Sequence, residues 1–438
     1  MFIGRGEELQ LLERHYESEG SQILVVYGAK GVGKTRLLRE FAEGRKSIYY
    51  AARACSGREQ CFQWARELRE SGLPVSEYPE YSDLLAAVLP EKTEKQLLIL
   101  DEFQYLVKGE REFFGELVNF LNYRRLSRPV MIVLVSSASG WVENHLVSRI
   151  GGNAAYINGF LKVRELPFGE MRMIFPGFSA RDAIQNYAVL GGIPGLWKSF
   201  DETLSAEENL IRHILSRESR LYGEMRVYLT EELREPAVYS TILGAIAGGS
   251  AKLNDIYLHT GFSRAKISVY LKNLMELDLV EKVYAGIYRI KTPYVRFYFR
   301  FLFPNLSLLE ELSPEDFYAK RVAGELPSYI DTAYGQICRQ VCEEELPDGV
   351  SATEWVGKGA HLDIVAVDGE NRRLAALCVY DRILDDGDYK KLISYAKKAG
   401  VQVDRACLFS ETGFANELRR KAAKGNVELK SITEEFNK

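Results

Sequence analysis

The feature that most constrains the fold is an apolar run that leads directly into a glycine-rich octapeptide. Residues Gln22–Tyr27 form a short, nearly continuous apolar segment, which is typical of a strand buried on both faces of a parallel sheet. The next eight residues, Gly28–Thr35, fit the pattern G-x-x-x-x-G-K-[ST], and the helix-favouring stretch 36–42 follows. This order of strand, loop and helix predicts a phosphate-binding loop (P-loop).

Each residue type in this loop has a physical task. Glycines let the backbone approach phosphate oxygens closely and point successive N–H groups at them, and the free N–H groups of the helix start add to this attraction. We expect Lys34 to reach the β- and γ-phosphates of ATP as a catalytic residue, and the Thr35 hydroxyl to bind Mg²⁺. The predicted phosphate-binding residues are Gly28, Ala29, Lys30, Gly31, Val32, Gly33, Lys34 and Thr35.

A second apolar run ends in two acidic residues. The strand candidate 96–100 is followed by Asp101 and Glu102. An aspartate at the end of a buried strand is suited to hold the Mg²⁺ shell, and the glutamate beside it to orient or deprotonate the attacking water. We therefore predict Asp101 as a magnesium residue and Glu102 as catalytic.

Two further strand candidates complete the expected sheet. They are 46–51 and 129–135, with helical stretches near 58–71 and 81–89 between them. In NTPases with a glutamate beside the aspartate, the strand that corresponds to 129–135 lies between the P-loop strand and the strand that ends in the aspartate. This strand carries a polar sensor near the γ-phosphate. Ser137 is our first candidate for the sensor and Ser136 the second, although serines at strand ends also occur in plain turns.

With these residues placed, the chain resembles ATPases of the AAA+/STAND superfamily, in particular the prokaryotic group with a C-terminal DUF234 domain. The opening residues 2–9 (FIGRGEEL) and the segment 100–106 (LDEFQYL) match family motifs closely, and 166–168 (LPF) matches one loosely. Residues 191–194 (GGIP) are similar to the GxP turn of a nucleotide-sensing helical lid. The resemblance implies adenine-side contacts from Ile3, Gly4, Arg5 and Pro194.

The family also implies a winged helix, and the local sequence supports one. Residues 252–259 read as a short amphipathic helix, 260–262 as a turn, and 264–274 as a second helix. Its apolar face is expected to hold Ile267, Tyr270 or Leu271, and Leu274. A hairpin signal follows, with strands 280–283 and 287–290 around 284–286.

Basic residues concentrate in this segment. Residues 251–300 hold nine lysines and arginines against four acidic residues, on a chain whose net charge is −4. Arg264, Lys266 and Lys272 fall outside the apolar face of the second helix, so we predict contact with the phosphates of duplex DNA. A winged helix used only for packing or protein contact is the alternative.

The C-terminal part looks like DUF234, whose fold is similar to restriction endonucleases. Such nucleases need an acidic pair for Mg²⁺ and a lysine for the nucleophile. Where the family reads E-I-D-I-V-A and E-C-K-W, this chain has 361–366 (HLDIVA) and 377–380 (LCVY). Asp363 is retained, but Leu377 replaces the acid and Val379 the lysine. Asp381 is a candidate to stand in for the lost acid, but the sequence offers no lysine beside it. We predict that this domain does not cut DNA.

The predicted architecture is α/β: a P-loop NTPase with an ASCE-type parallel sheet, a helical lid, a winged helix and an α/β endonuclease-like domain. The expected limits are 1–165 for the ATPase core, 166–235 for the lid, 236–292 for the winged helix, 293–334 for a helical linker and 335–438 for the DUF234-like domain.

Composition narrows the function classes. The chain is 46% hydrophobic and 27% charged, as in globular proteins, and it has no apolar run long enough for a bilayer, no signal-peptide pattern, no CxxC and no HExxH. We expect a cytoplasmic, ATP-hydrolysing switch coupled to DNA, with a self-associating or partner-binding scaffold of little turnover as the alternative. Arg149 is a candidate arginine finger, not distinguished by spacing from Arg124, Arg125 or Arg128.

Overall fold

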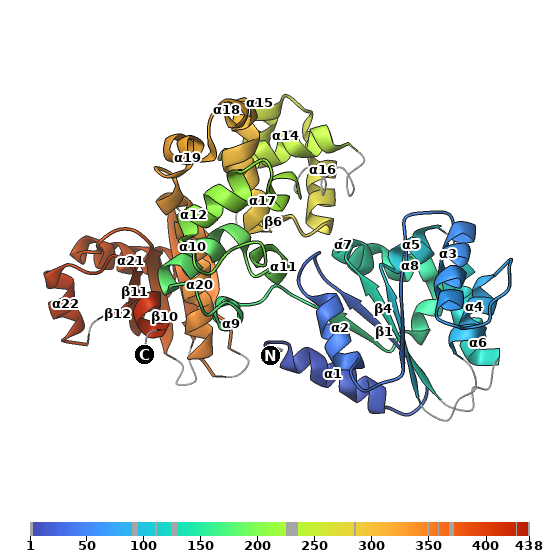
Figure 1. Ribbon diagram of the computed structural model, residues 1–438. Helices are drawn as coiled ribbons and strands as arrows, with labels where there is room; N and C mark the ends of the chain where they lie inside the picture. The colour runs from blue at the N-terminus through green and yellow to red at the C-terminus, as the bar shows by residue number, and fades with distance from the viewer. Residues whose placement is uncertain are drawn as a thin grey trace. The chain divides into compact units, whose positions relative to one another are not determined.

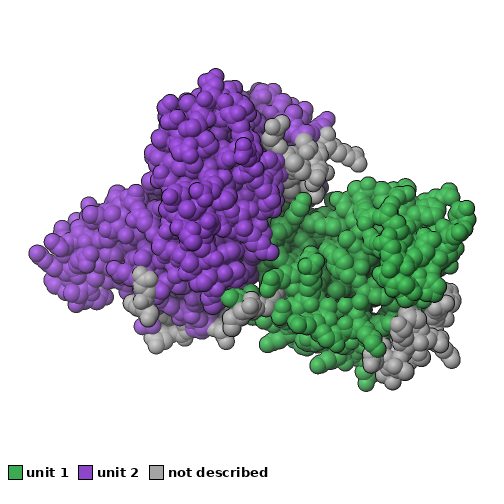
Figure 2. Space-filling view, in the orientation of Figure 1, with its two compact units in different colours: residues 1–165, 276–278 green, residues 166–275, 279–438 purple. Residues whose placement is uncertain are grey.

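The computed structural model describes residues 3–89, 95–109, 112–123, 129–224, 235–283, 286–347, 350–357, 359–367, 372–425 and 427–436. The chain divides into two compact units (Figure 2), each described by itself below. The first comprises Met1–Glu165 with Glu276–Asp278, and the second comprises Leu166–Met275 with Leu279–Lys438.

The first unit is built on a five-stranded parallel sheet with the order β2-β3-β4-β1-β5. Figure 1 labels two of its strands, β1 and β4. Its strands are β1 (Gln22–Tyr27), β2 (Ser47–Ala51), β3 (Gln96–Asp101), β4 (Val130–Ser136) and β5 (Gly159–Lys162). The strands predicted from the apolar runs are confirmed, and β4 lies between β1 and β3 as expected. This is the P-loop NTPase fold, and it brings the carboxyl ends of β1, β3 and β4 to one edge of the sheet.

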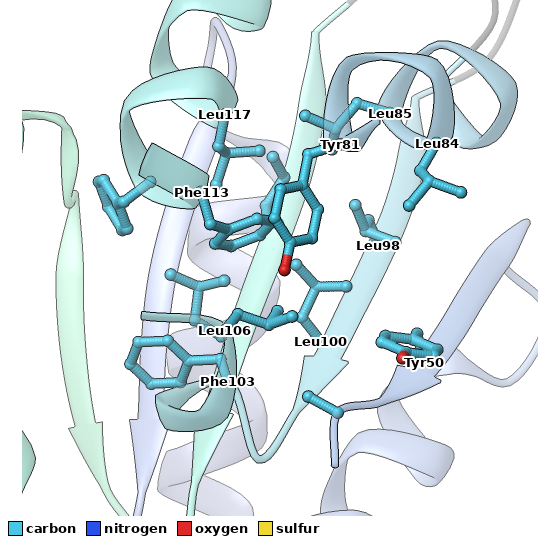
Figure 3. Close-up of a cluster of buried hydrophobic side chains, with 14 of the residues drawn as sticks. Tyr50, Tyr81, Leu84, Leu85, Leu98, Leu100, Phe103, Leu106, Phe113 and Leu117 are labelled. Atoms are coloured by element: carbon cyan, nitrogen blue, oxygen red, sulfur yellow. The ribbon is translucent and has the colours of Figure 1, made fainter. Parts of the chain in front are cut away.

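Helices flank this sheet and pack their apolar faces against its buried strands. They are α1 (Gly6–Glu17), α2 (Lys34–Ala42), α3 (Gly57–Glu70), α4 (Tyr81–Val88), α5 (Gln104–Gly109), α6 (Glu112–Tyr123), α7 (Ser139–Trp141), η1 (Val142–Leu146), α8 (Val147–Ile150) and η2 (Gly151–Tyr156). Figure 3 shows one face of the core, where Leu98 and Leu100 of β3 point toward Tyr81 and Leu85 of α4 and Phe113 of α6. This packing fixes the height at which β3 ends, and therefore the position of its acidic residues.

The second unit begins with helices and ends with a mixed sheet. Its early helices are α9 (Phe168–Ile174), α10 (Ala180–Leu190), α11 (Pro194–Trp197), α12 (Ala206–Leu210), η3 (Ile211–Leu215), α14 (Pro236–Ala247), α15 (Leu253–Thr260) and α16 (Arg264–Glu276). An antiparallel hairpin, β6 (Val280–Val283) and β7 (Ile287–Ile290), follows α16, and residues 284–285 of the predicted turn lie outside the described part of the chain. Ile267, Leu271 and Leu274 of α16 are buried, as their spacing predicts.

Aromatic helices connect the hairpin to the C-terminal sheet. They are α17 (Pro293–Phe297), η5 (Tyr298–Leu302), η6 (Phe303–Asn305), α18 (Leu306–Glu311), α19 (Pro314–Phe317), η7 (Tyr318–Val322) and α20 (Leu326–Glu344). Helix α20 runs through residue 335, so the predicted limit between linker and last domain falls inside a helix. It packs on β9 and β10 of the sheet and on α10.

The C-terminal sheet has the order β12-β11-β10-β9-β8 and mixes parallel with antiparallel pairs. Its elements are β8 (Thr353–Gly357), β9 (Ala360–Val367), β10 (Arg373–Val379), α21 (Asp386–Ala399), β11 (Arg405–Ser410), α22 (Asn416–Ala422), β12 (Glu428–Lys430) and α23 (Ile432–Phe436). Across the described ranges, no helix is both long enough and apolar enough to span a bilayer.

Candidate functional site

The P-loop is shaped by a close backbone approach and by two left-handed glycines. A Cβ atom on Gly28 would lie 2.2 Å from the carbonyl oxygen of Val163, so only glycine fits where the loop leaves β1. Gly31 and Gly33 have φ of 86° and 104°, a region that side chains with a Cβ rarely adopt. Gly33 is the N-cap of α2, so the loop turns there and the free N–H groups of the helix start face the loop.

Lys34 is buried at the first position of α2 and reaches back over the loop. Its Nζ donates to the carbonyl oxygens of Gly28 at 2.7 Å and Ala29 at 3.1 Å. Burial lowers the pKa of the Lys34 ammonium, while the nearby carboxylates of Glu102 and Asp101 act in the opposite direction. A cation held at the mouth of a loop of inward N–H groups is the arrangement that attracts phosphate.

Asp101 ends β3 beside the start of α2. Its Oδ2 accepts a hydrogen bond from the Thr35 hydroxyl at 3.4 Å, so the two predicted magnesium residues lie together. Tyr49 of β2, which no sequence pattern singled out, donates its phenol hydroxyl to the same oxygen at 2.5 Å. Burial raises the pKa of the Tyr49 phenol, and the hydrogen bond to Asp101 acts in the same direction. The phenol is therefore the hydrogen donor in this contact.

Glu102 is held at the sheet edge by groups from two elements. Its Oε2 accepts hydrogen bonds from Ser137 Oγ at 2.7 Å, from the Ser137 backbone N–H at 3.3 Å and from Gln104 Nε2 at 2.5 Å. Ser136, our second sensor candidate, is fully buried and donates to Gln104 Oε1 at 2.7 Å. The two serines therefore have different positions: Ser137 contacts the acid directly, and Ser136 acts on it through Gln104.

The backbone at Glu102 is unusual, because this non-glycine residue has a φ of 52°. Such a conformation costs of the order of 1 kcal/mol and persists where the surroundings enforce it, often at functional sites. Here the Glu102 N–H donates to Asp101 Oδ1 at 2.9 Å, and the N–H of Phe103 donates to Val135 of β4 at 2.9 Å. These bonds turn the chain sharply after β3 and aim the Glu102 side chain toward β4.

The predicted adenine-side residues fall in both units. Arg5 is the N-cap of α1, and its guanidinium donates to the carbonyl oxygens of Val32 at 3.0 Å and Arg164 at 2.6 Å. This buried arginine ties the N-terminal segment, which includes Ile3 and Gly4, to the P-loop backbone. Pro194 lies in the second unit at the first turn of α11, so its relation to adenine stays a prediction.

Close backbone contacts within the second unit explain the glycines of the GGIP turn. A Cβ atom on Gly192 would lie 1.9 Å from the Leu166 carbonyl oxygen, and the Gly192 carbonyl accepts the Leu166 N–H at 2.8 Å. Trp197 Nε1 donates to the Gly191 carbonyl at 2.8 Å. The turn therefore clamps the segment that follows the ATPase core.

The arginine-finger candidates are only partly covered by the structure. Arg149 lies on α8, and its Nε donates to the Val107 carbonyl oxygen at 3.3 Å. Arg124, Arg125 and Arg128 lie outside the described residues. The choice among them stays open.

The three candidate DNA residues are exposed on α16, but the basic surplus around them is smaller than the sequence suggests. Arg264 stacks 4.0 Å over the Tyr257 ring and donates to Asn254. Arg289 of β7, counted in the surplus, forms two hydrogen bonds of 3.0 and 3.1 Å with Glu354 of β8 and one of 2.9 Å with Glu281. The hairpin therefore uses this charge to dock on the C-terminal sheet.

Glu354 is the centre of a charged cluster beside a cavity of about 520 Å³. Burial opposes ionisation of this carboxyl, but hydrogen bonds from His361 and Arg289 outweigh it and hold its pKa at about 2. Asp363 lies next to the cluster and accepts the Cys378 N–H at 2.9 Å. Within the described ranges, no three His, Cys, Asp or Glu side chains gather as a metal-binding group.

Comparison with known proteins supports the ATPase assignment. Residues 2–200 match a family described as an ATPase domain predominantly from Archaea, and residues 298–387 match DUF234, described as archaeal and bacterial proteins of unknown function. An uncharacterised protein of Methanocaldococcus jannaschii is 24% identical over 416 residues, which cover 90% of each chain. The match to DUF234 begins at residue 298, inside the predicted linker.

Two solved structures share the fold. A Walker-type ATPase of Pyrococcus abyssi has 19% identity and a TM-score of 0.53, covering 68% of this chain and 96% of that one. The ORC2 protein of Aeropyrum pernix, solved in ADPNP–ADP complexes, has 16% identity and a TM-score of 0.50, covering 72% of this chain and 95% of that one. The fold of about two thirds of this chain is thus shared by proteins with little sequence in common.

Proposed function

We propose that this chain, which joins an ATPase domain of a predominantly archaeal family to a DUF234 segment, is a Mg²⁺-dependent, ATP-hydrolysing conformational switch of the AAA+/STAND type. One observation carries the proposal: Lys34, Asp101, Glu102 and Ser137 meet at one edge of one sheet, around a loop whose glycines leave room for phosphate. The reaction would transfer the γ-phosphoryl group of ATP to water.

The P-loop residues bind the nucleotide in this proposal. Backbone N–H groups of Gly28–Thr35 cradle the phosphates, and the Lys34 ammonium leaves its present carbonyl partners to contact the β- and γ-phosphates. The exchange is favourable because a phosphate oxygen carries more negative charge than a carbonyl oxygen.

Thr35 and Asp101 fit a magnesium site. A hydroxyl and a carboxylate are the oxygen ligands that Mg²⁺ takes beside nucleotide phosphates, and the two residues already touch. Bound Mg²⁺ supplies neutralisation of the charge that develops on the phosphates. The position of the end of β3 beside the start of α2 would hold Asp101 and Thr35 next to each other for the ion.

Glu102 orients and deprotonates the water that attacks. A carboxylate held by three hydrogen bonds has little freedom to rotate, so it can present its second oxygen in one direction. Ser137 also links Glu102 to the end of β4, which is where a γ-phosphate sensor is expected. We therefore assign Ser137 the sensor role and Ser136 the support of Gln104.

The output of the switch is conformational. We interpret α14, α15, α16 and the β6–β7 hairpin as a winged helix, and the described helices within 166–235 as a lid. Exposed Arg264, Lys266 and Lys272 support duplex DNA as the partner, with phosphate contacts supplying the attraction. A second copy of the chain or a protein partner is the other option.

The C-terminal domain is proposed to be non-catalytic. Leu377 and Val379 stand where a nuclease would need an acid and a lysine, and Asp363 is hydrogen-bonded to the Cys378 backbone. The neighbouring carboxylate, Glu354, is already paired with Arg289 and His361, so within the described residues Asp363 lacks a free acidic partner for a catalytic Mg²⁺. The domain instead anchors the hairpin through Glu354 and Arg289.

The test is steady-state phosphate release by the full chain, with and without duplex DNA, together with its mass with and without nucleotide. We expect release that stops in the Lys34→Ala variant, because this change removes the charge that faces the phosphates. Tight ATP retention with almost no release, unaffected by DNA, would favour a nucleotide-gated scaffold instead. Undiminished ATP affinity of Lys34→Ala would show that the nucleotide site lies elsewhere.

A further inference from the structure

Tyr49 lies on β2, at one edge of the sheet, and contacts the aspartate at the end of the neighbouring strand. In the parallel pairing of β2 with β3, Ala51 lies opposite Asp101 and Tyr49 lies opposite Ile99. Because alternate residues of a strand share a face, Tyr49 and Asp101 are diagonal neighbours on the same face. Their hydrogen bond of 2.5 Å joins positions 52 residues apart in the sequence.

The hydrogen bonds on the Asp101 carboxylate leave little capacity for new donors. Oδ2 accepts from the Tyr49 phenol at 2.5 Å and from the Thr35 hydroxyl at 3.4 Å, and Oδ1 accepts the Glu102 N–H at 2.9 Å. An ionised carboxylate offers about four acceptor positions, two on each oxygen. Both positions on Oδ2 are therefore used by the protein itself.

We propose that Tyr49 is a positioning residue that competes with Mg²⁺ for Asp101 and so sets how much Mg²⁺ the site requires. Mg²⁺ keeps several water molecules when it binds, and these waters donate hydrogen bonds to nearby carboxylates. A short O–H···O⁻ bond is among the stronger hydrogen bonds in proteins, so the phenol opposes this arrangement until it is displaced. The inference rests on the nucleotide site proposed above.

The surroundings of Tyr49 suit a bond that forms and breaks. Its side chain is 45% exposed, so the phenol can turn away from Asp101 into solvent without leaving a buried hydroxyl unsatisfied. Tyr50, the next residue, differs in its exposure and in its hydrogen-bond partner. It is fully buried, stacks on Trp64 and donates to Gln60 Oε1 at 2.8 Å.

The experiment titrates Mg²⁺ while the binding of a fluorescent ATP analogue to the full chain is measured. For Tyr49→Phe we expect the half-saturating Mg²⁺ concentration to fall about tenfold, equivalent to about 1.4 kcal/mol. Affinity for the analogue in EDTA should not change, because the P-loop is intact. Tyr50→Phe is the matched control, since it removes a phenol hydroxyl from the same strand on the other face, and its Mg²⁺ requirement should equal that of the wild type.

The outcomes separate this inference from the proposed function. An unchanged half-saturating concentration in Tyr49→Phe would show that the phenol does not compete, and a higher one would show that it supports the metal site; either result overturns the inference. Failure of the wild-type chain to bind the analogue in any condition would overturn the nucleotide site and the inference together.

Discussion

Replacing Glu102 by glutamine should block hydrolysis while nucleotide binding is kept. The hydrogen bonds of this side chain allow the size of each effect to be estimated. The three donors around this side chain all point at one oxygen, Oε2, from Ser137 Oγ and N–H and from Gln104 Nε2. The amide oxygen of glutamine can accept the same three hydrogen bonds. The substitution therefore keeps the side chain in place and removes only the negative charge and the basic oxygen.

The expected stability change is small and the expected rate change is large. Hydrogen bonds to a charged acceptor are about twice as strong as neutral ones, and this side chain is partly exposed, so each of the three bonds should lose about 0.5 kcal/mol and the free energy of unfolding should fall by about 1–2 kcal/mol. Loss of a general base lowers the rate by roughly 10²–10⁴-fold, which is about 3–5 kcal/mol in activation free energy. ATP affinity should stay within about threefold, because the phosphate contacts belong to the P-loop.

Two assays on the same preparation test this: single-turnover phosphate release and equilibrium binding of a fluorescent ATP analogue. Glu40→Gln, an exposed charge loss on α2, serves as the matched control and should leave both quantities unchanged. Retained turnover in Glu102→Gln, within about threefold of the wild type, would refute the reasoning and show that another group orients the water.

Three other outcomes are expected. Gly28→Ala places a methyl group 2.2 Å from the Val163 carbonyl oxygen, so calorimetry should show a lower Tm, from a loss of about 1–3 kcal/mol, and nucleotide binding should weaken; an unchanged Tm would contradict the close approach. The pKa of Glu354 is lowered from 4.5 to about 2, so its carboxylate contributes about 3 kcal/mol to the free energy of unfolding. This contribution is fully present above pH 4.5 and is lost as the pH falls toward 2. Urea midpoints across this range should fall less steeply in Glu354→Gln than in the wild type. Charge reversal of Arg264, Lys266 and Lys272 to glutamate should weaken binding of duplex DNA of any sequence and reduce the salt slope by about 0.9 for each DNA phosphate that the variant no longer neutralises; unchanged binding would remove DNA from the proposed function.

Much of the first unit could be predicted because its signals are local. Buried parallel strands are continuous apolar runs, and the P-loop glycines mark both the turn and the helix start, so the strands β1 to β4 and their order about β4 agree with the sequence. Strand β5 was missed because it has only four residues, and these include a glycine and a lysine. Its short pattern resembles a loop, and only its pairing with β1 makes it a strand.

The residues of the proposed site could be named from the sequence, but the hydrogen bonds that hold them could not. Tyr49 looks like any aromatic residue of a strand, and Gln104 like an ordinary residue of a helix start. Only the register of β2 on β3 brings the first to Asp101, and only the turn after β3 brings the second to Glu102. No spacing rule singled out Tyr49, and the motif 100–106 that contains Gln104 gave this residue no role, because each role depends on what the neighbouring element presents.

The sequence by itself therefore determined the nucleotide-binding fold and the residue types that can hold phosphate, metal and water, since these depend on patterns within about ten residues of chain. The tertiary structure decided how those residues are restrained: Ser137 on Glu102 across 35 positions, and Tyr49 on Asp101 across 52. It also decided that Arg289, counted as part of a basic surface, pairs with Glu354 across 65 positions. Hydrogen bonds and ion pairs act over a few ångströms, so their partners are chosen by packing rather than by position along the chain.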